Sequence, residues 1–274
     1  MADIETEIET SAAGTDDADR PLFQSQRQDE IAALAMRHGR VDVSAMATRF
    51  NVTTETIRRD LSELQSRKVL RRVHGGAVPW ERLRFEPLLS VRGASQQGEK
   101  RRIGLLAAEE VPPSGSLLID SGSTTARFCE ALPRDRALTV VTNSILNAQV
   151  LADFEQIDVM MLGGKLRKNT MATVDAQAIA EVEQLTVDVL FISCDGMSIA
   201  RGLTTPYRNE AMLKQAMIRS ARKVIALVDH TKIDNDQLLK FADWSAIDVL
   251  ITDTGVDESM LRSLESVVPT VRTA

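Results

Sequence analysis

The sequence predicts an α/β protein in which an N-terminal winged helix-turn-helix domain precedes a domain built on a mostly parallel sheet. Three observations lead to this fold class. Three short helical patterns are followed by a Gly-Gly hairpin, basic residues concentrate in that same region, and buried-strand patterns then alternate with helical ones. A chain of 274 residues, 43% hydrophobic and 26% charged, can bury the cores of two such globular domains.

The distribution of charge along the chain indicates an anionic partner for the N-terminal domain. The net charge is −6, but residues 1–19 hold seven acidic residues and no basic one. Residues 20–102 hold 17 basic against 9 acidic residues, and the remainder is acidic again. Residues 1–22 have no periodicity, so we expect a disordered acidic tail there.

The predicted winged helix-turn-helix domain covers residues 23–78. A first helix starts at a capping box formed by Ser25 and Gln28 and stops at Gly39. A second helix spans 43–50 with Asp42 as its cap, and a turn at 51–52 leads to a third helix from 53 to about 67. A hairpin at 69–78, turned at Gly75-Gly76, forms the wing.

Side chains on the outer face of the third helix and on the wing are candidate DNA contacts. The start of the helix favours a phosphate, and an arginine such as Arg58 can read guanine. Adjacent arginines can also merely solvate a helix, but the basic wing beside them favours DNA binding. The candidates are Thr53, Thr54, Thr56, Arg58, Arg59, Lys68, Arg71, Arg72 and His74, with Glu55 a further candidate for base edges.

The second domain is predicted to follow a linker at 79–98 and to occupy 99–274. Its candidate strands are 116–120, 138–142, 158–162, 187–193, 223–229 and 248–253, with helices such as 125–132 between them. In a parallel α/β sheet the carboxyl ends of the strands meet at one crevice, where ligands bind.

Polar residues follow several of these strands and form a candidate site for a phosphorylated sugar. The segment from Asp120 to Thr125 joins a strand to a helix, so its amides and hydroxyls can hold an anion. Gly163-Gly164 alone could be a simple turn, and Glu210 with Lys214 could be an ordinary surface pair. The candidates are Asp120, Ser121, Gly122, Ser123, Thr124, Thr125, Asn143, Gly163, Gly164, Lys165, Asp195, Glu210, Lys214, Asp229 and Lys232.

Two motifs of the N-terminal domain resemble the DeoR family of bacterial transcriptional regulators. They are Thr-Ile-Arg-Arg-Asp-Leu at 56–61 and Arg-Arg-Val-His-Gly-Gly-Ala at 71–77. Lys68 stands where the family usually has a small residue, and Thr53 replaces its usual serine. Within the first motif we expect Asp60 to orient Arg59 or to support packing.

The second domain is similar to the effector domain of this family, whose fold resembles ribose-5-phosphate isomerase. The resemblance implies sensing of phosphorylated sugars without turnover. Asp175 departs from the family's usual glycine. The matching residues are 99–101, 120–125, 142–144, 163–164, 195–196, 202–205, Glu210, Lys214, Asp229, Lys232 and 251–253.

The resemblance implies a cytoplasmic bacterial repressor of sugar-catabolism genes, associated with the nucleoid when bound to DNA. Its partners would be double-stranded operator DNA, a phosphorylated sugar that releases it, and further copies of the chain in a dimer or tetramer. The alternative is a sugar-phosphate isomerase with a DNA-binding appendage. Because Met197-Ser198-Ile199 after Asp195-Gly196 supplies no carboxylate for proton transfer, we expect no catalytic residue.

Further functions are not expected from the composition. No apolar run approaches the ~20 residues that cross a bilayer, and the acidic start does not resemble a secretory signal. The two cysteines, Cys129 and Cys194, lack metal-ligand spacing. We therefore expect no membrane association, no metal and no cofactor.

Overall fold

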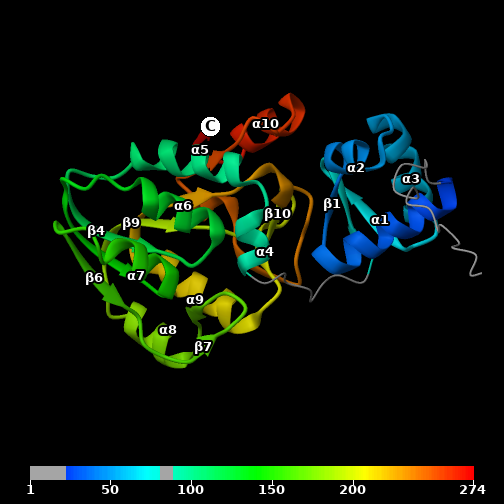
Figure 1. Cartoon of the computed structure of the whole chain (residues 1–274). Helices are drawn as coiled ribbons and strands as arrows, with labels where there is room; N and C mark the ends of the chain where they lie inside the picture. The colour runs from blue at the N-terminus through cyan, green and yellow to red at the C-terminus, as the bar shows by residue number, and fades with distance from the viewer. Residues whose placement is uncertain (1–22, 81–88) are drawn as a thin grey trace, which may run out of the picture.

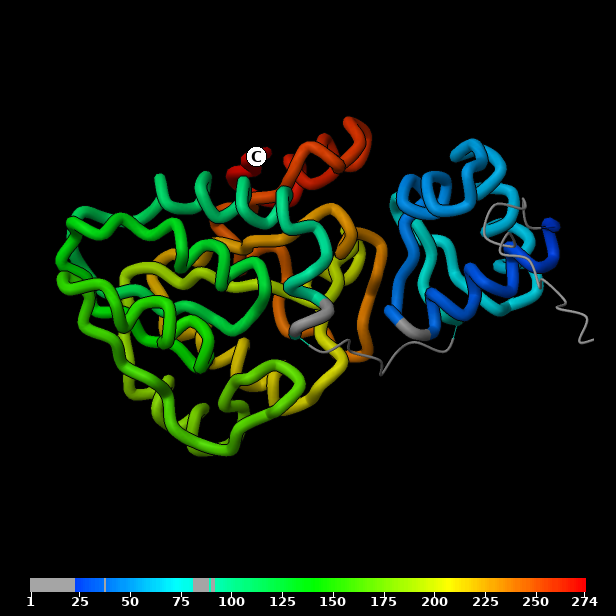
Figure 2. The backbone as a smooth tube through the Cα atoms, viewed as in Figure 1, coloured from blue at the N-terminus to red at the C-terminus, as the bar shows by residue number. Residues whose placement is uncertain are grey.

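The computed structural model describes residues 23–80 and 89–274, which form a small N-terminal head and a larger sheet domain (Figures 1 and 2). The predicted tail at 1–22 and residues 81–88 of the predicted linker lie outside the described residues. None of the helices in the described part is long and apolar enough to cross a membrane.

The head consists of three helices and a three-stranded antiparallel sheet of order β1-β3-β2. The helices close over one small core, to which Ile31, Ile57, Leu61 and Leu64 contribute fully buried side chains. The elements are α1 (Gln24–His38), β1 (Val41–Asp42), α2 (Val43–Phe50), α3 (Thr54–Ser66), β2 (Leu70–Val73) and β3 (Gly76–Pro79).

The start of α1 differs from the predicted capping box. Phe23 is the residue before the helix, and the Gln26 side chain accepts a hydrogen bond from its backbone N–H at 3.2 Å. Ser25 therefore lies inside the helix, while the Gln28 amide donates to Asp60 and Glu63 of α3. The prediction was wrong because Gln26, two residues before Gln28, accepts the hydrogen bond from the first free amide, that of Phe23.

The wing is a hairpin, as predicted, but it turns one residue earlier. His74 and Gly75 form the turn, with Gly75 at a φ of 68°, and Gly76 already belongs to β3. A side chain at position 76 would collide with the backbone of Val41, since a Cβ there would lie 2.1 Å from its carbonyl oxygen. The close approach explains the additional strand β1, which pairs with β3 and was not predicted.

The second domain is organised around a seven-stranded sheet that is parallel throughout, with strand order β15-β14-β12-β9-β4-β5-β6. All six predicted strands are present within two residues of their expected bounds, which confirms the α/β fold class. The strands are β4 (Ser114–Ile119), β5 (Ala137–Thr142), β6 (Ile157–Met161), β9 (Val187–Ile192), β12 (Ala221–Leu227), β14 (Val249–Thr252) and β15 (Thr270–Thr273).

Two apolar layers cover the two faces of this sheet. One contains Ile103 and Phe128 from α5 and α6, and the other contains Val182 and Met217 from α8 and α9. The helices are α4 (Leu89–Ala94), α5 (Gln97–Ala108), α6 (Ser123–Ala131), α7 (Ile145–Leu151), α8 (Ala176–Val182), α9 (Arg208–Arg219) and α10 (Glu258–Glu265), with 3-10 turns at η1 (His230–Lys232) and η2 (Trp244–Ala246).

Two smaller sheets lie beside the main one. A three-stranded antiparallel sheet has the order β10-β11-β13, and β7 pairs with β8 in a hairpin. The strands are β7 (Leu166–Arg167), β8 (Ala172–Thr173), β10 (Gly196–Ser198), β11 (Gly202–Thr205) and β13 (Leu239–Ala242).

The segment predicted as a linker at 79–98 is partly ordered into elements of secondary structure. Pro79 is the last residue of β3, residues 89–94 form α4, and α5 begins at Gln97. The composition of the segment hid α4, because Pro87, Gly93 and Gly98 are more typical of a connection than of a helix.

Candidate functional site

The exposed face of α3 presents most of the predicted DNA contacts. Thr53 caps the helix, since its hydroxyl accepts the Thr56 N–H at 3.1 Å and lies 2.9 Å from the Thr56 hydroxyl. Arg58 and Arg59 are exposed, and Arg58 makes only a loose ion pair with Glu55 at 3.4 Å. An ion pair this exposed costs little to exchange for a base edge or a phosphate.

The buried end of the same motif holds α3 against α1. Asp60 is 1% exposed and accepts a hydrogen bond from Arg27 at 2.6 Å. The expectation that Asp60 supports packing is confirmed, but it orients Arg27 and not Arg59. Arg59 is therefore left on the outer face of the helix.

The wing carries three exposed or half-buried cations, Lys68, Arg71 and Arg72. Arg72 also donates to the Ser62 hydroxyl of α3 at 2.9 Å, which ties the wing to the recognition helix. His74 differs from them, because its ring lies 3.2 Å from Asp257 and 3.3 Å from the carbonyl oxygen of Gly255 in the sheet domain. In this conformation His74 does not face outward with the other predicted DNA contacts.

The main sheet has a topological switch point between β4 and β9, because the chain adds β5 and β6 on one side of β4 and β9 and β12 on the other. Ligands of open α/β sheets bind at such points, outside the carboxyl ends of the strands. Asp120 follows β4 there and Ser193 follows β9. We call the surroundings of these two strand ends the cleft.

The N-terminus of α6 lies in the cleft and has no side-chain cap. Gly122 precedes the helix, and a Cβ at that position would lie 2.5 Å from the Ser193 hydroxyl, so a side chain there would have to displace that hydroxyl. The Ser121 hydroxyl and the Asp120 Oδ1 are both buried and have no hydrogen-bond partner within the described chain. Uncapped amides beside unpartnered buried oxygens provide both donors and acceptors for a polar ligand.

Lys214 of α9 lies between the two strand ends that define the cleft. Its Nζ donates to the Asp120 carboxylate and, at 2.9 Å, to the Ser193 carbonyl, so it joins the ends of β4 and β9. Both side chains of the ion pair are at most 2% exposed. Burial lowers the pKa of Lys214, but the carboxylates of Asp120 and Glu210 outweigh it and raise that pKa, which keeps the ammonium charged.

The acid of the predicted pair, Glu210, is also buried. It forms an ion pair with Arg167 of β7 at 3.4 Å, and Arg167 packs over the Tyr207 ring at 4.4 Å from the ring centroid. Glu210 and Lys214 therefore belong to the cleft and are not an ordinary surface pair.

Asp195 and Asp229 provide two more carboxylates in the cleft, and both have cations nearby. Asp195 pairs with Arg92 at 2.9 Å and accepts the Thr205 hydroxyl at 2.8 Å. Burial opposes ionisation, but the charges of Arg92 and Lys232 hold the pKa of Asp195 below its usual value. Lys232 has no carboxylate within 4 Å among the residues that the structure describes, so it is available to an anion.

Lys100 of α5 is buried beside Asp229, with its Nζ 4.0 Å from the Asp229 Oδ2. This oxygen has no hydrogen-bond partner among the described residues. Burial lowers the pKa of Lys100 to about 8, against the attraction of Asp229 and together with repulsion from Lys232 and Arg92.

Other predicted residues support the cleft without presenting free groups to it. The Asn143 amide accepts the Ser121 N–H at 3.0 Å and donates to the Thr173 carbonyl, so it positions the loop after β4. Thr124 is buried, and the Thr125 hydroxyl donates to the Gly122 carbonyl.

The loop at Gly163, Gly164 and Lys165 is hydrogen-bonded to α8 and to the residue that caps this helix. The Gly163 N–H donates to Glu181 and the Lys165 N–H donates to Asp175, which also caps α8. The Lys165 side chain is exposed. The departure at Asp175 therefore has a structural role, and the carboxylates of Asp175 and Glu181 already accept the Lys165 and Gly163 amides that an anion could use in this loop.

Three cations of the cleft were absent from the predicted set: Arg92, Lys100 and Arg167. Each meets its carboxylate from a distant part of the sequence, so no local spacing could reveal the pairing. No group of three or more potential metal ligands occurs within residues 23–80 and 89–274.

A winged helix-turn-helix head with an exposed basic recognition helix, joined to a parallel α/β domain with a polar cleft, defines a DNA-binding regulator with a sensor domain. The chain belongs to the DeoR family of transcriptional regulators. Residues 27–82 match the DeoR-like helix-turn-helix domain and residues 95–254 match the DeoR C terminal sensor domain. The family assignment confirms the prediction of a regulator over the alternative of an isomerase.

The chain is also similar over most of its length to individual regulators. It is 32% identical to the HTH-type transcriptional regulator GlpR of Haloferax volcanii, over 91% of this chain and 98% of that protein. It is 33% identical to the HTH-type transcriptional repressor GlcR of Bacillus subtilis, over 85% and 89% of the two chains. The glycerol-3-phosphate regulon repressor of Escherichia coli is 29% identical over 89% of this chain and 96% of its own.

Among solved structures, ribose 5 phosphate isomerase A from Neisseria gonorrhoeae is one match, with a TM-score of 0.35 and 22% identity. The match covers 49% of this chain and 52% of that one. This likeness is remote.

Proposed function

We propose that the protein is a repressor of sugar-catabolism genes that binds a phosphorylated sugar in the cleft and then releases its operator. The observation that carries the proposal is the pair of unpartnered buried oxygens on Asp120 and Ser121, next to the uncapped N-terminus of α6. The amides of α6 suit a phosphate, while the carboxylates of Asp120 and Asp229 suit the hydroxyls of a sugar.

The electrostatics of the cleft support an anionic ligand. Lys214 and Arg167 are held by carboxylates, whereas Lys232 has none within 4 Å in the described chain. A phosphate dianion at the N-terminus of α6 would gain hydrogen bonds from its uncapped amides and attraction from Lys232. The names of the relatives agree with a phosphorylated ligand, since one is the repressor of a glycerol-3-phosphate regulon.

The DNA side of the proposal assigns the exposed residues of α3 to base edges and phosphates. Arg58 and Thr54 would face the major groove, and Arg59, Lys68, Arg71 and Arg72 would meet phosphates. We propose that the protein acts in the cytoplasm as a homo-oligomer, because a symmetric pair of heads matches the half-sites of an operator. Its mass in solution tests this part directly.

A thermal-shift panel tests the ligand. Inorganic phosphate, glycerol 3-phosphate, ribose 5-phosphate and glucose 6-phosphate are compared with the unphosphorylated glycerol, ribose and glucose. At least one phosphorylated compound should raise the melting temperature of the protein, while its unphosphorylated counterpart should not. A panel in which none of the phosphorylated compounds raises it would contradict the assignment.

Ser123→Glu locates the site of binding. A carboxylate in the first turn of α6 should repel a phosphate and abolish the thermal shift, while operator binding by the head is retained. Ser259→Glu is the matched control, since Ser259 is exposed in the first turn of α10 and outside the cleft. A Ser123→Glu variant that binds the phosphorylated compound with unchanged affinity would remove the phosphate from α6.

A further inference from the structure

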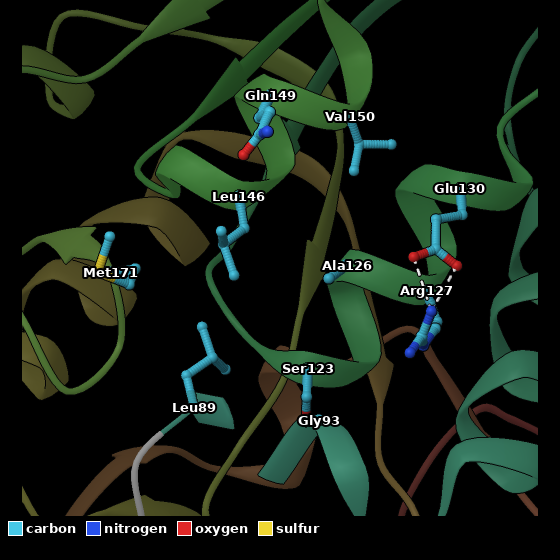
Figure 3. A pocket seen from close by; sticks show the side chains of 10 residues that line it. All are labelled: Leu89, Gly93, Ser123, Ala126, Arg127, Glu130, Leu146, Gln149, Val150 and Met171. Carbon is cyan, nitrogen blue, oxygen red and sulfur yellow. Dashed lines mark hydrogen bonds and ion pairs between the residues drawn. The ribbon is translucent and has the colours of Figure 1, made fainter. Parts of the chain in front are cut away.

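The helix α4 is the first described element after the head, and it packs against the cleft. Leu89 and Gly93 line one cavity of about 500 Å³ together with Ser123 and Arg127 of α6 (Figure 3). The Leu89 N–H also donates to the Asn169 carbonyl at 2.9 Å. In the sequence, α4 therefore stands between the head and the rest of the sensor domain.

One side of α4 is held by a buried ion pair. Arg92 lies 2.9 Å from Asp195, and the two side chains are only 12% and 10% exposed. Asp195 lies three residues after Ile192, the last residue of β9, and is one of the acids of the candidate ligand site. This ion pair thus joins α4 to a candidate residue for effector binding.

The turn between α4 and α5 is held by a second cation. Lys100 donates to the Arg92 carbonyl at 2.6 Å and to the Ser95 carbonyl at 2.8 Å. The same ammonium lies 4.0 Å from the Asp229 carboxylate. The C-terminal half of α4 is therefore linked to two acids of the candidate ligand site, to Asp195 through Arg92 and to Asp229 through Lys100.

We propose that α4 transmits occupancy of the cleft to the head, and that Arg92 is the positioning residue through which it does so. The inference rests on the proposed phosphorylated effector. Hydroxyls that donate to Asp195 compete with Arg92 for its oxygens, and a phosphate at Ser123 adds negative charge beside Gly93. The ligand thereby changes the partners that hold α4, and with them the start of the chain to the head.

Hydrogen exchange of the backbone amides of residues 89–94 tests whether Arg92 stabilises α4, and this measurement needs no ligand. In Arg92→Gln these amides should exchange faster than in the wild type, because the ion pair with Asp195 is lost. Arg127→Gln is the matched control: Arg127 lines the same cavity but pairs with Glu130 on its own helix. Equal exchange in Arg92→Gln and the wild type would overturn the proposal.

The operator affinity, measured with and without a phosphorylated sugar, tests whether α4 transmits ligand binding in the cleft to the head. The probe is whichever of glycerol 3-phosphate, ribose 5-phosphate and glucose 6-phosphate shifts the wild-type melting temperature most. A coupled site changes operator affinity by about 5- to 150-fold, and Arg92→Gln should reduce this ratio to about twofold or less at saturating probe. Arg92→Lys, which keeps the cation, should restore part of it.

The two possible failures are distinguishable. If Arg92 only contacted the ligand, Arg92→Gln would bind the probe more weakly yet reach the full wild-type release at saturation, and this outcome overturns the proposal. If none of the three probes shifts the wild-type protein, the proposed effector class fails, and the exchange of 89–94 still decides whether Arg92 holds α4.

Discussion

Replacement of Lys214 by methionine should destabilise the sensor domain strongly. Methionine preserves the length and most of the packing of the side chain but removes the ammonium from the Asp120 carboxylate. Because both side chains are at most 2% exposed, water cannot take the place of the lost cation. Removing one partner of a buried ion pair costs about 3–5 kcal/mol in the free energy of unfolding.

The remaining contacts of Asp120 indicate how the loss depends on pH. Burial already raises the pKa of Asp120, and the substitution removes the cation that opposes this rise while the Ser193 N–H, 3.3 Å from Oδ2, remains. A raised carboxyl pKa destabilises the fold progressively as pH rises from the ordinary carboxyl pKa to the raised value, and fully above it, because the acid then ionises in the unfolded chain more readily than in the fold. The destabilisation by Lys214→Met should therefore be largest near neutral pH and smaller in acid.

Urea unfolding followed by the fluorescence of buried Trp244 measures the effect, in a Trp80→Phe background that leaves the sensor domain as the only source of signal. Asp120→Asn combined with Lys214→Met should recover most of the loss. Lys223→Met is the control, because its pair with Glu110 is partly exposed and worth about 1 kcal/mol or less. A Lys214→Met variant that loses no more than this control would refute the reasoning.

Two further predictions concern the head and a histidine next to the cleft. Arg58→Ala should weaken operator binding by about 1–3 kcal/mol and relax the base preference at one position, measured by anisotropy with single-base operator variants; unchanged affinity and preference would exclude Arg58 from recognition. Although burial opposes it, the Asp253 carboxylate raises the pKa of His230, whose ring lies 2.7 Å from it. This stabilisation is fully present below the ordinary histidine pKa of about 6.5 and is lost as pH rises through the raised value. His230→Gln should therefore flatten the plot of unfolding free energy against pH in this range. An unaltered plot would show that the ion pair does not contribute.

Sequence patterns predicted most elements wherever local signals and tertiary packing agree. The helix 43–50 has its predicted bounds, because an apolar stripe and the turn at Asn51 coincide. The strand β15 was missed because Thr-Val-Arg-Thr at the sheet edge forms no buried apolar run. The two-residue β1 was missed because its pairing depends on a distant strand, which no local propensity encodes.

The cleft was predicted less completely than the fold. Strand ends can be located from sequence, so Asp120, Asp195 and Asp229 were found together. Arg92, the partner of Asp195, comes from a segment whose glycines and proline indicated a linker, while Lys100, beside Asp229, was noted only as part of the family resemblance. Pairing across the fold is set by topology, and periodicity carries no information about it.

Ligand binding in the cleft should control the affinity of the head for DNA. Anisotropy titrations of fragments from upstream of the protein's own gene, at low salt, measure this with and without the phosphorylated sugar that stabilises the protein. We expect tight binding to one fragment and a much weaker complex once the sugar is present. A compound that demonstrably occupies the cleft yet leaves the affinity for that fragment unchanged would contradict it.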